Sequence, residues 1–248
     1  MSQQVLNERT FSPGYEAQVT GGKQVTRTMT VGGTAVKAAL FLAVTLVFAS
    51  IGWDRAEQVL DINPIWFLLG FVVLIGLTFV AARSPRVAAP LGFVYGVLMG
   101  TYIGAISRFY EAEFDGIVGQ ALFCTLAVFG VTLALYGFRI VRVTNRFINT
   151  VITATIGVVF FYLATFVLDL LGVNLVSLNE PSPLSIGISV VISLIAAANL
   201  FVDYAFIERG TQQGAPKQME WLCAFALLTT LVWLYLELLR LLSLLRGD

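Results

Sequence analysis

Stretches of about twenty consecutive apolar residues dominate this chain, and that is the length an α-helix needs to cross the hydrocarbon core of a bilayer. Hydrophobic residues fill 58% of the 248 positions and charged residues only 12%, whereas soluble domains usually carry about a quarter charged residues. Backbone polar groups inside lipid must bond within their own segment, so each stretch is expected to be a helix. The sequence therefore predicts an all-α membrane protein with almost no soluble domain.

Seven stretches have the length and apolarity of a spanning helix, with short connectors between them. They are residues 34–53, 64–82, 87–107, 118–138, 148–171, 184–207 and a final run that ends near Leu245. Residues 1–33 are polar and mixed in charge, with neither the apolar core nor the cleavage site of a signal peptide. We expect a flexible cytoplasmic tail at 1–33 and a seven-helix transmembrane domain at 34–248.

The basic residues between the apolar stretches predict the orientation, because cytoplasmic loops of membrane proteins are rich in Lys and Arg. If the N-terminus is cytoplasmic, the outer segments hold only Arg55, Arg108 and Arg246. The inner segments then hold Lys23, Arg27, Lys37, Arg83, Arg86, Arg139, Arg142, Arg146, Arg209 and Lys217. This bias predicts a multi-pass membrane protein with a cytoplasmic N-terminus.

The third span carries a small residue at every fourth position, which forms one smooth ridge along the helix. The ridge comprises Ala88, Gly92, Gly96, Gly100 and Gly104. Such stripes let two backbones approach closely, so we expect a tight helix crossing inside the bundle. A homodimer face or a pore lining is the alternative.

Several classes of function lack the residues that they need. The chain has no histidine, which removes the usual proton shuttle and the commonest metal ligand. Cys124 and Cys223 each lie in an apolar run and indicate buried side chains rather than a zinc or disulfide framework. The net charge of zero does not favour nucleic-acid binding. We therefore expect no cofactor, no nucleic-acid partner and no enzymatic activity.

Two acids lie within apolar runs, Asp203 in the sixth span and Glu237 in the last. A charged side chain costs a few kcal/mol or more at the bilayer centre, so intramembrane acids are candidates for function. Arg240 follows Glu237 by three positions on the same helical face and is its expected local partner. The plainer alternatives are that Asp203 reaches the cytoplasmic interface and that Arg240 neutralises Glu237.

The two acids stand in the segments "NLFVDYAFIERG" and "LYLELLRLLSLLR". This pattern resembles the transmembrane Bax-inhibitor-motif family in its prokaryotic branch, and the resemblance covers nearly the whole chain. Together with the short loops, the resemblance implies a protein of the bacterial inner membrane. It implies that Asp203 and Glu237 are paired carboxylates of a pH-sensitive calcium leak, although many members have Asp where this chain has Glu237. It also implies a latch, in which an arginine at the end of the second span pairs with Asp203 of the sixth. Arg83 is the first choice for this arginine and Arg86 the second. Ordinary membrane anchoring is the alternative role of these arginines.

Pairing of the two acids sets a condition on the last helix, which we expect to be central in the bundle. If that helix rose straight from Met219, Glu237 would lie ~27 Å deep and Asp203 only ~8 Å deep. Contact would then require the residues up to about Leu228 to lie along the interface or to re-enter partway. We expect such a segment before the last helix.

Three functions remain for a chain of this kind. The first is a cation leak, with weak transient calcium binding at Asp203 and Glu237, because calcium prefers six to eight oxygen ligands and two acids supply few. The second is a non-conducting regulatory protein that acts on a membrane protease or stress-response partner. The third, an intramembrane aspartyl protease, is disfavoured because the Tyr-Asp and Gly-x-Gly-Asp patterns of those enzymes are absent.

Overall fold

A computed structural model gives the fold and describes residues 28–60, 73–74, 76–78, 80–81, 83–172 and 180–247. In this part of the chain the regular structure is helical, and six helices are long and apolar enough to cross a membrane. The chain is thus a multi-pass helical membrane protein. The expected span at 64–82 lies largely outside the described residues, as does most of the expected tail at 1–33.

The long helices agree with the expected spans to within a few residues. The described helices are α2 (Val31–Asp54), the short α3 (Ala56–Leu60), α5 (Ala88–Glu113), α6 (Ile117–Gly137), α7 (Asn145–Leu170), α8 (Pro183–Gln212) and α9 (Met219–Arg246). Local chemistry sets where α8 begins. The Ser182 hydroxyl accepts a hydrogen bond from the backbone of Ser185, whose own hydroxyl accepts one from the backbone of Ser182. Pro183 at the first helical position completes this reciprocal cap.

The chain forms two compact units, and α8 and α9 each contribute to both. The first unit contains the chain up to Phe109 together with Asp203–Thr230. The second contains Tyr110–Val202 and Leu231–Asp248. Asp203 therefore belongs to the first unit and Glu237 to the second.

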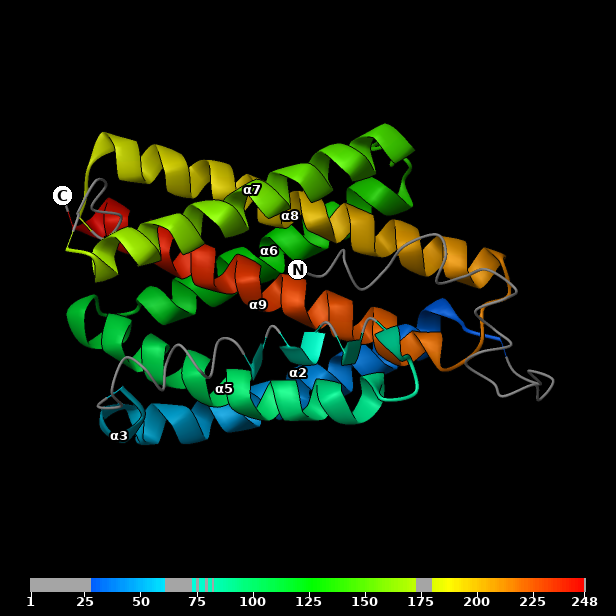
Figure 1. The fold of residues 1–248 in the computed structure, drawn as a ribbon, viewed down its shortest axis with the longest axis horizontal. Coiled ribbons are helices and arrows are strands. Elements are labelled where there is room, and N and C mark those ends of the chain that lie inside the picture. Colours follow the sequence, from blue (N-terminus) through cyan, green and yellow to red (C-terminus); the bar gives the residue numbers. More distant parts are fainter. Residues whose placement is uncertain are drawn as a thin grey trace. The chain divides into compact units, whose positions relative to one another are not determined.

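In the first unit the small-residue ridge of α5 lies against α2, and the two helices run side by side (Figure 1). A Cβ atom added to Gly104 would lie 1.9 Å from the Ala49 carbonyl oxygen, and one added to Gly100 would lie 2.4 Å from that of Thr45. Farther toward the start of α5, a Cβ at Gly92 would meet the ring of Phe41 at 2.3 Å. Contacts that advance together along both helices show that α2 and α5 run parallel.

The start of α2 is held against the turn between α8 and α9, also within the first unit. Thr28 forms an isolated antiparallel bridge with Pro216, and the Met29 amide donates a 2.8 Å hydrogen bond to the Ala215 carbonyl. Residues 28–33 are therefore part of the folded unit, so the expected tail boundary at 33 was a few residues too late. Thr30 is the N-cap that starts α2, because its hydroxyl accepts from the Gly33 amide at 3.0 Å.

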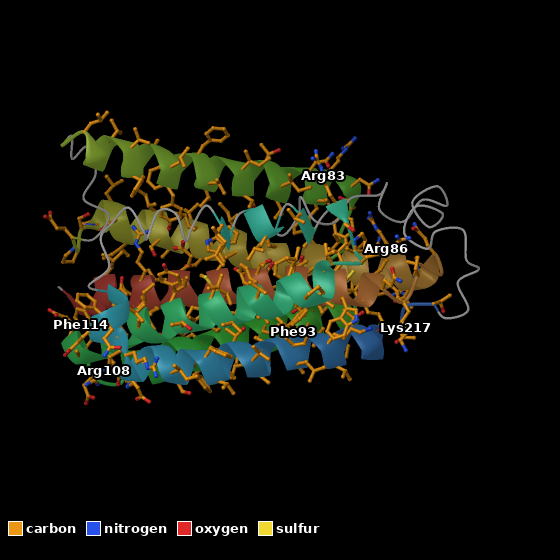
Figure 2. All side chains as sticks on the ribbon, turned by 60° about the horizontal axis from the view of Figure 1, so that its bottom comes forward. Arg83, Arg86, Phe93, Arg108, Phe114 and Lys217 are labelled. Carbon is orange, nitrogen blue, oxygen red and sulfur yellow. The ribbon has the colours of Figure 1, made fainter. Side chains whose placement is uncertain are left out.

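The basic residues of the first unit gather as the sequence suggested. Arg83, Arg86 and Lys217 lie at one end of the unit and Arg108 at the other (Figure 2). The Arg108 guanidinium lies 5.6 Å from the ring centroid of Trp53, near the end of α2. Which side of the membrane each end faces stays a prediction.

The second unit joins α7 to α8 through polar side chains in an apolar setting. The Asn199 amide donates to the Thr155 hydroxyl at 2.9 Å, and both side chains are buried. Farther from the core, α6 exposes large apolar side chains such as Phe123, which is 73% exposed. A face of this kind is expected to contact lipid.

The last helix differs from the expectation. Residues Met219–Arg246 form one continuous helix, so the interfacial or re-entrant segment up to about Leu228 was wrong. The physical reason is local, since this run contains neither Gly nor Pro to interrupt the helical hydrogen bonds. As expected for a central helix, α9 is the most buried of the six long helices, with 83% of its most apolar stretch buried.

Candidate functional site

Asp203 lies in the first unit on α8, where it is 1% exposed. The helix continues to Gln212, so Asp203 stands about 13 Å of helical rise before its end. Neither carboxylate oxygen has a hydrogen-bond partner among the described residues. Its electrostatic neighbours include Thr230 and Cys223 on α9.

Asp203 receives no hydrogen bond from its neighbour Thr230, because the Thr230 hydroxyl has another acceptor. The Thr230 hydroxyl donates at 3.2 Å to the Ala226 carbonyl of its own helix. A buried carboxylate without donors costs several kcal/mol in its charged form. A negative charge on Asp203 would therefore need water or a cation to compensate it.

Glu237 lies in the second unit on α9, is 5% exposed and has a defined partner on one side only. Its Oε1 atom accepts from the Tyr162 hydroxyl at 2.5 Å and from the Trp233 indole at 3.2 Å. Its Oε2 atom is buried and has no hydrogen-bond partner among the described residues. The Oε1 atom is thus held by two donors, whereas the Oε2 atom can still accept a hydrogen bond or contact a cation.

Arg240, the expected local partner of Glu237, is linked to it through Tyr162. Its Nη1 atom donates to the Tyr162 hydroxyl at 2.8 Å, and its guanidinium lies 5.7 Å from the centroid of that ring. Sequence reasoning missed Tyr162, which comes from α7, far from the other residues in the chain. Its polar hydroxyl inside an apolar run was the available signal, since buried Tyr usually finds a hydrogen-bond partner.

A third buried acid, Glu220 at the start of α9, was also missed. It is 0% exposed, and it forms a salt bridge with Lys37 of α2. Its Oε1 atom accepts from the Thr30 amide at 2.9 Å and from the Thr30 hydroxyl at 3.1 Å. Lys37 was counted only as an inner charge, although a lysine inside an apolar run predicts a carboxylate partner.

An aromatic cluster in the first unit contacts this ion pair through Trp221. The Lys37 ammonium lies 5.0 Å from the Trp221 ring centroid. Trp221 in turn packs on Phe41 and on Phe93, which is marked in Figure 2, with centroids 5.4 and 5.9 Å apart. Glu220 is fully satisfied in an apolar cage, so its role is to hold the start of α2 against α9.

The expected latch is not closed in this structure. Arg83 and Arg86 are exposed, and Figure 2 shows both at the end of the first unit. Asp203 is buried and accepts no hydrogen bond from either of them among the described residues. A latch between α8 and these arginines stays a prediction for another state of the protein.

The expected pairing of Asp203 with Glu237 would join the two units and stays a prediction. The segment that we expected to bring the two acids to one level is absent, because α9 is continuous from Met219. Glu237 follows Thr230, a neighbour of Asp203, by seven residues, which is ~10 Å of helical rise. Among the described residues, no group of three or more His, Cys, Asp or Glu side chains is placed to hold a metal ion.

Comparison with known families agrees with this architecture. A family model described as Bax inhibitor 1 like matches residues 4–247, which is nearly the whole chain. The chain belongs to the Bax inhibitor 1 like family. The match includes α8 and α9 of this family member, and so both of its expected carboxylates. No curated protein and no solved structure matches the chain.

Proposed function

We propose that this protein is a cation leak pathway, with calcium as the ion to assay, whose conductance is set by protonation of Asp203. The observation that carries the proposal is the Asp203 carboxylate, which is buried in a spanning helix with both oxygens unpartnered among the described residues. Intramembrane acids are rare and usually serve ion or proton pathways. Membership of the Bax inhibitor 1 like family is consistent with a role at the membrane.

The proposed gate follows from the cost of an isolated charge in an apolar setting. While protonated, Asp203 is neutral and attracts no cation. When it loses the proton, the new negative charge must be compensated by water, by a cation or by a rearranged neighbour. A proton can therefore bias the bundle between a closed and a conducting arrangement.

Calcium binding at such a site would be weak and transient. Asp203 supplies only two carboxylate oxygens, both unpartnered among the described residues. Calcium prefers six to eight oxygen ligands, so backbone carbonyls and water must provide the rest. Weak binding suits passage, because an ion that is held tightly does not leave.

Reconstitution in liposomes tests the proposal. We expect calcium entry, followed with an internal dye, to rise with pH as Asp203 loses its proton. Asp203→Asn mimics the protonated side chain and should give low entry that does not respond to pH. Glu113→Gln is the matched control, because Glu113 is exposed at the end of α5.

The outcomes separate the proposal from its main alternative. Calcium entry that keeps its pH response in Asp203→Asn would remove Asp203 as the gate. Glu237→Gln in the same assay shows whether the second acid contributes to the response. No entry of calcium or of other cations under any condition would favour a non-conducting regulatory protein in the bacterial inner membrane.

A further inference from the structure

A face of α8 carries polar side chains at helical spacing, and it is buried along most of the helix. Ser185, Ser189, Ser193 and Asn199 are 0%, 0%, 7% and 0% exposed. On other faces of the same helix, Leu194 is 65% and Val191 is 55% exposed. The polar face therefore points inward and the apolar faces are turned toward lipid.

The side chains at the two ends of this face form hydrogen bonds within the protein. Ser185 belongs to the cap of α8 and donates to the Glu180 carbonyl at 2.7 Å. Asn199 bonds to Thr155 of α7 and to the Ile195 carbonyl of its own helix. These side chains have structural roles.

The middle of the face is different. The hydroxyls of Ser189 and Ser193 are buried and have no hydrogen-bond partner among the described residues. A hydroxyl inside a helix normally donates to the carbonyl four residues earlier. Thr125 and Thr155 do so here, at 2.7 and 2.9 Å. Ser189 and Ser193, one helical turn apart, do not make this bond. Their hydroxyls can therefore bond to a ligand.

The spacing of the two serines fits water. They are one turn apart, which is ~6 Å of rise, and one water that bonds to both hydroxyls spans ~5.6 Å. Each hydroxyl offers one donor and two acceptors, so water can chain from one to the next. The spanning part of α8 before Glu208 contains no Lys or Arg, and one turn beyond Asn199 it reaches Asp203.

We propose that Ser189 and Ser193 form a hydrated track on the inner face of α8 through which hydrated cations move along the helix. The ligand class is water and the small cations that it carries. This inference rests on the proposed leak function, because a leaking cation needs a polar path through an apolar bundle. The serine oxygens replace part of the water shell of the ion while it passes.

Cysteine accessibility tests the track directly. Ser189→Cys and Ser193→Cys are made in a Cys124→Ala, Cys223→Ala background and reconstituted in liposomes. Ile192→Cys and Leu194→Cys flank Ser193 and serve as matched controls, one buried among apolar groups and one facing lipid. The probe is a cationic methanethiosulfonate reagent, compared with an anionic one.

We expect both serine positions to react at least about tenfold faster than both controls, because a thiol in apolar surroundings forms the reactive thiolate far less often. The cationic reagent should react faster than the anionic one. Rates at Ser189→Cys and Ser193→Cys that equal those of the controls would overturn the track. Equal rates with the two reagents would overturn its preference for cations.

Calcium entry measured on the same liposomes separates this inference from the proposed function. Reactive serine positions in a protein that passes no calcium would leave the hydrated track in place and remove the leak. Calcium entry through a protein whose serine positions are unreactive would keep the leak and overturn the track. As a second readout, Ser189→Ala with Ser193→Ala should reduce calcium entry while its response to pH is kept.

Discussion

At the scale of single residues, the three buried acids differ in how completely their charge is compensated. Glu220 has a lysine and two hydrogen bonds from Thr30. Glu237 has two donors on one oxygen and none on the other among the described residues. Asp203 has none on either oxygen. A buried charge with its full set of partners stabilises the fold. A buried charge without partners raises the free energy of the folded protein, and binding of a proton or a cation lowers it again.

The structural role of Glu220 gives a prediction on stability. Lys37→Met keeps the length of the side chain but leaves the Glu220 carboxylate buried without its cation. Removing one partner of a buried ion pair costs about 3–5 kcal/mol, so the melting temperature in detergent should fall clearly. Thermal unfolding followed by circular dichroism measures the change.

Lys217→Met is the control for this variant, because Lys217 is exposed in the turn before α9. Its effect should stay within about 0.5 kcal/mol, as is usual for surface substitutions. If Lys37→Met unfolds at the same temperature as Lys217→Met, the ion pair does not hold α2 against α9.

At the scale of helices, the bundle uses close backbone contact where apolar side chains have no drive to associate. The α5 ridge meets α2 at Gly100 and Gly104, where a Cβ would approach backbone oxygens. On α2, a Cβ atom added to Gly52 would lie 2.1 Å from the Thr101 carbonyl oxygen. Small residues on both helices thus permit the crossing, as in other tightly packed membrane helices.

Substitution at the crossing should separate α2 from α5. Gly104→Ala places a Cβ 1.9 Å from the Ala49 carbonyl oxygen, which is backbone and cannot rotate away. We expect a loss of about 1–3 kcal/mol, typical of overpacking, seen as a lower melting temperature in detergent.

Gly130→Ala in α6 provides the comparison, because a Cβ there meets nothing within 4 Å. Alanine favours a helix over glycine by about 1 kcal/mol, so this variant should be neutral or slightly stabilised. Equal stability of the two variants would show that the α2–α5 contact is looser than described.

At the scale of the whole molecule, the chain forms two units, and α8 and α9 supply segments to both. The first unit contains the buried acids Asp203 and Glu220, and the second contains Glu237. In the first unit the basic residues Arg83, Arg86 and Lys217 gather at one end and Arg108 lies at the other (Figure 2). By the positive-inside rule the richer end is expected to face the cytoplasm.

Labelling of single cysteines in intact cells tests that orientation. Gln218→Cys lies exposed at the basic end, and Glu57→Cys lies exposed on α3, beyond the end of α2. A membrane-impermeant maleimide should label Glu57→Cys in intact cells and Gln218→Cys only after the cells are opened. The reverse pattern would invert the orientation and place the Lys37–Glu220 pair at the outer face.

The positions of the six described spans could be read from the sequence, because lipid imposes length and apolarity on each helix separately. The same local logic located Asp203, Glu237 and the α5 ridge, since each is unusual within its own run. It failed for the start of the last helix. There the expected pairing of Asp203 with Glu237 suggested that the helix is interrupted near Leu228. A run without Gly or Pro instead favours the continuous α9 that the structure shows.

Sequence alone therefore determined that this is a multi-pass helical membrane protein and which of its residues are costly to bury. Only the tertiary structure decided which of those buried side chains have a partner that compensates their charge. Lys37 and Glu220 are 183 residues apart, and Tyr162 and Glu237 are 75 residues apart. Hydropathy is a property of a segment, whereas compensation of a buried charge depends on which side chains the packing of different helices brings within bonding distance.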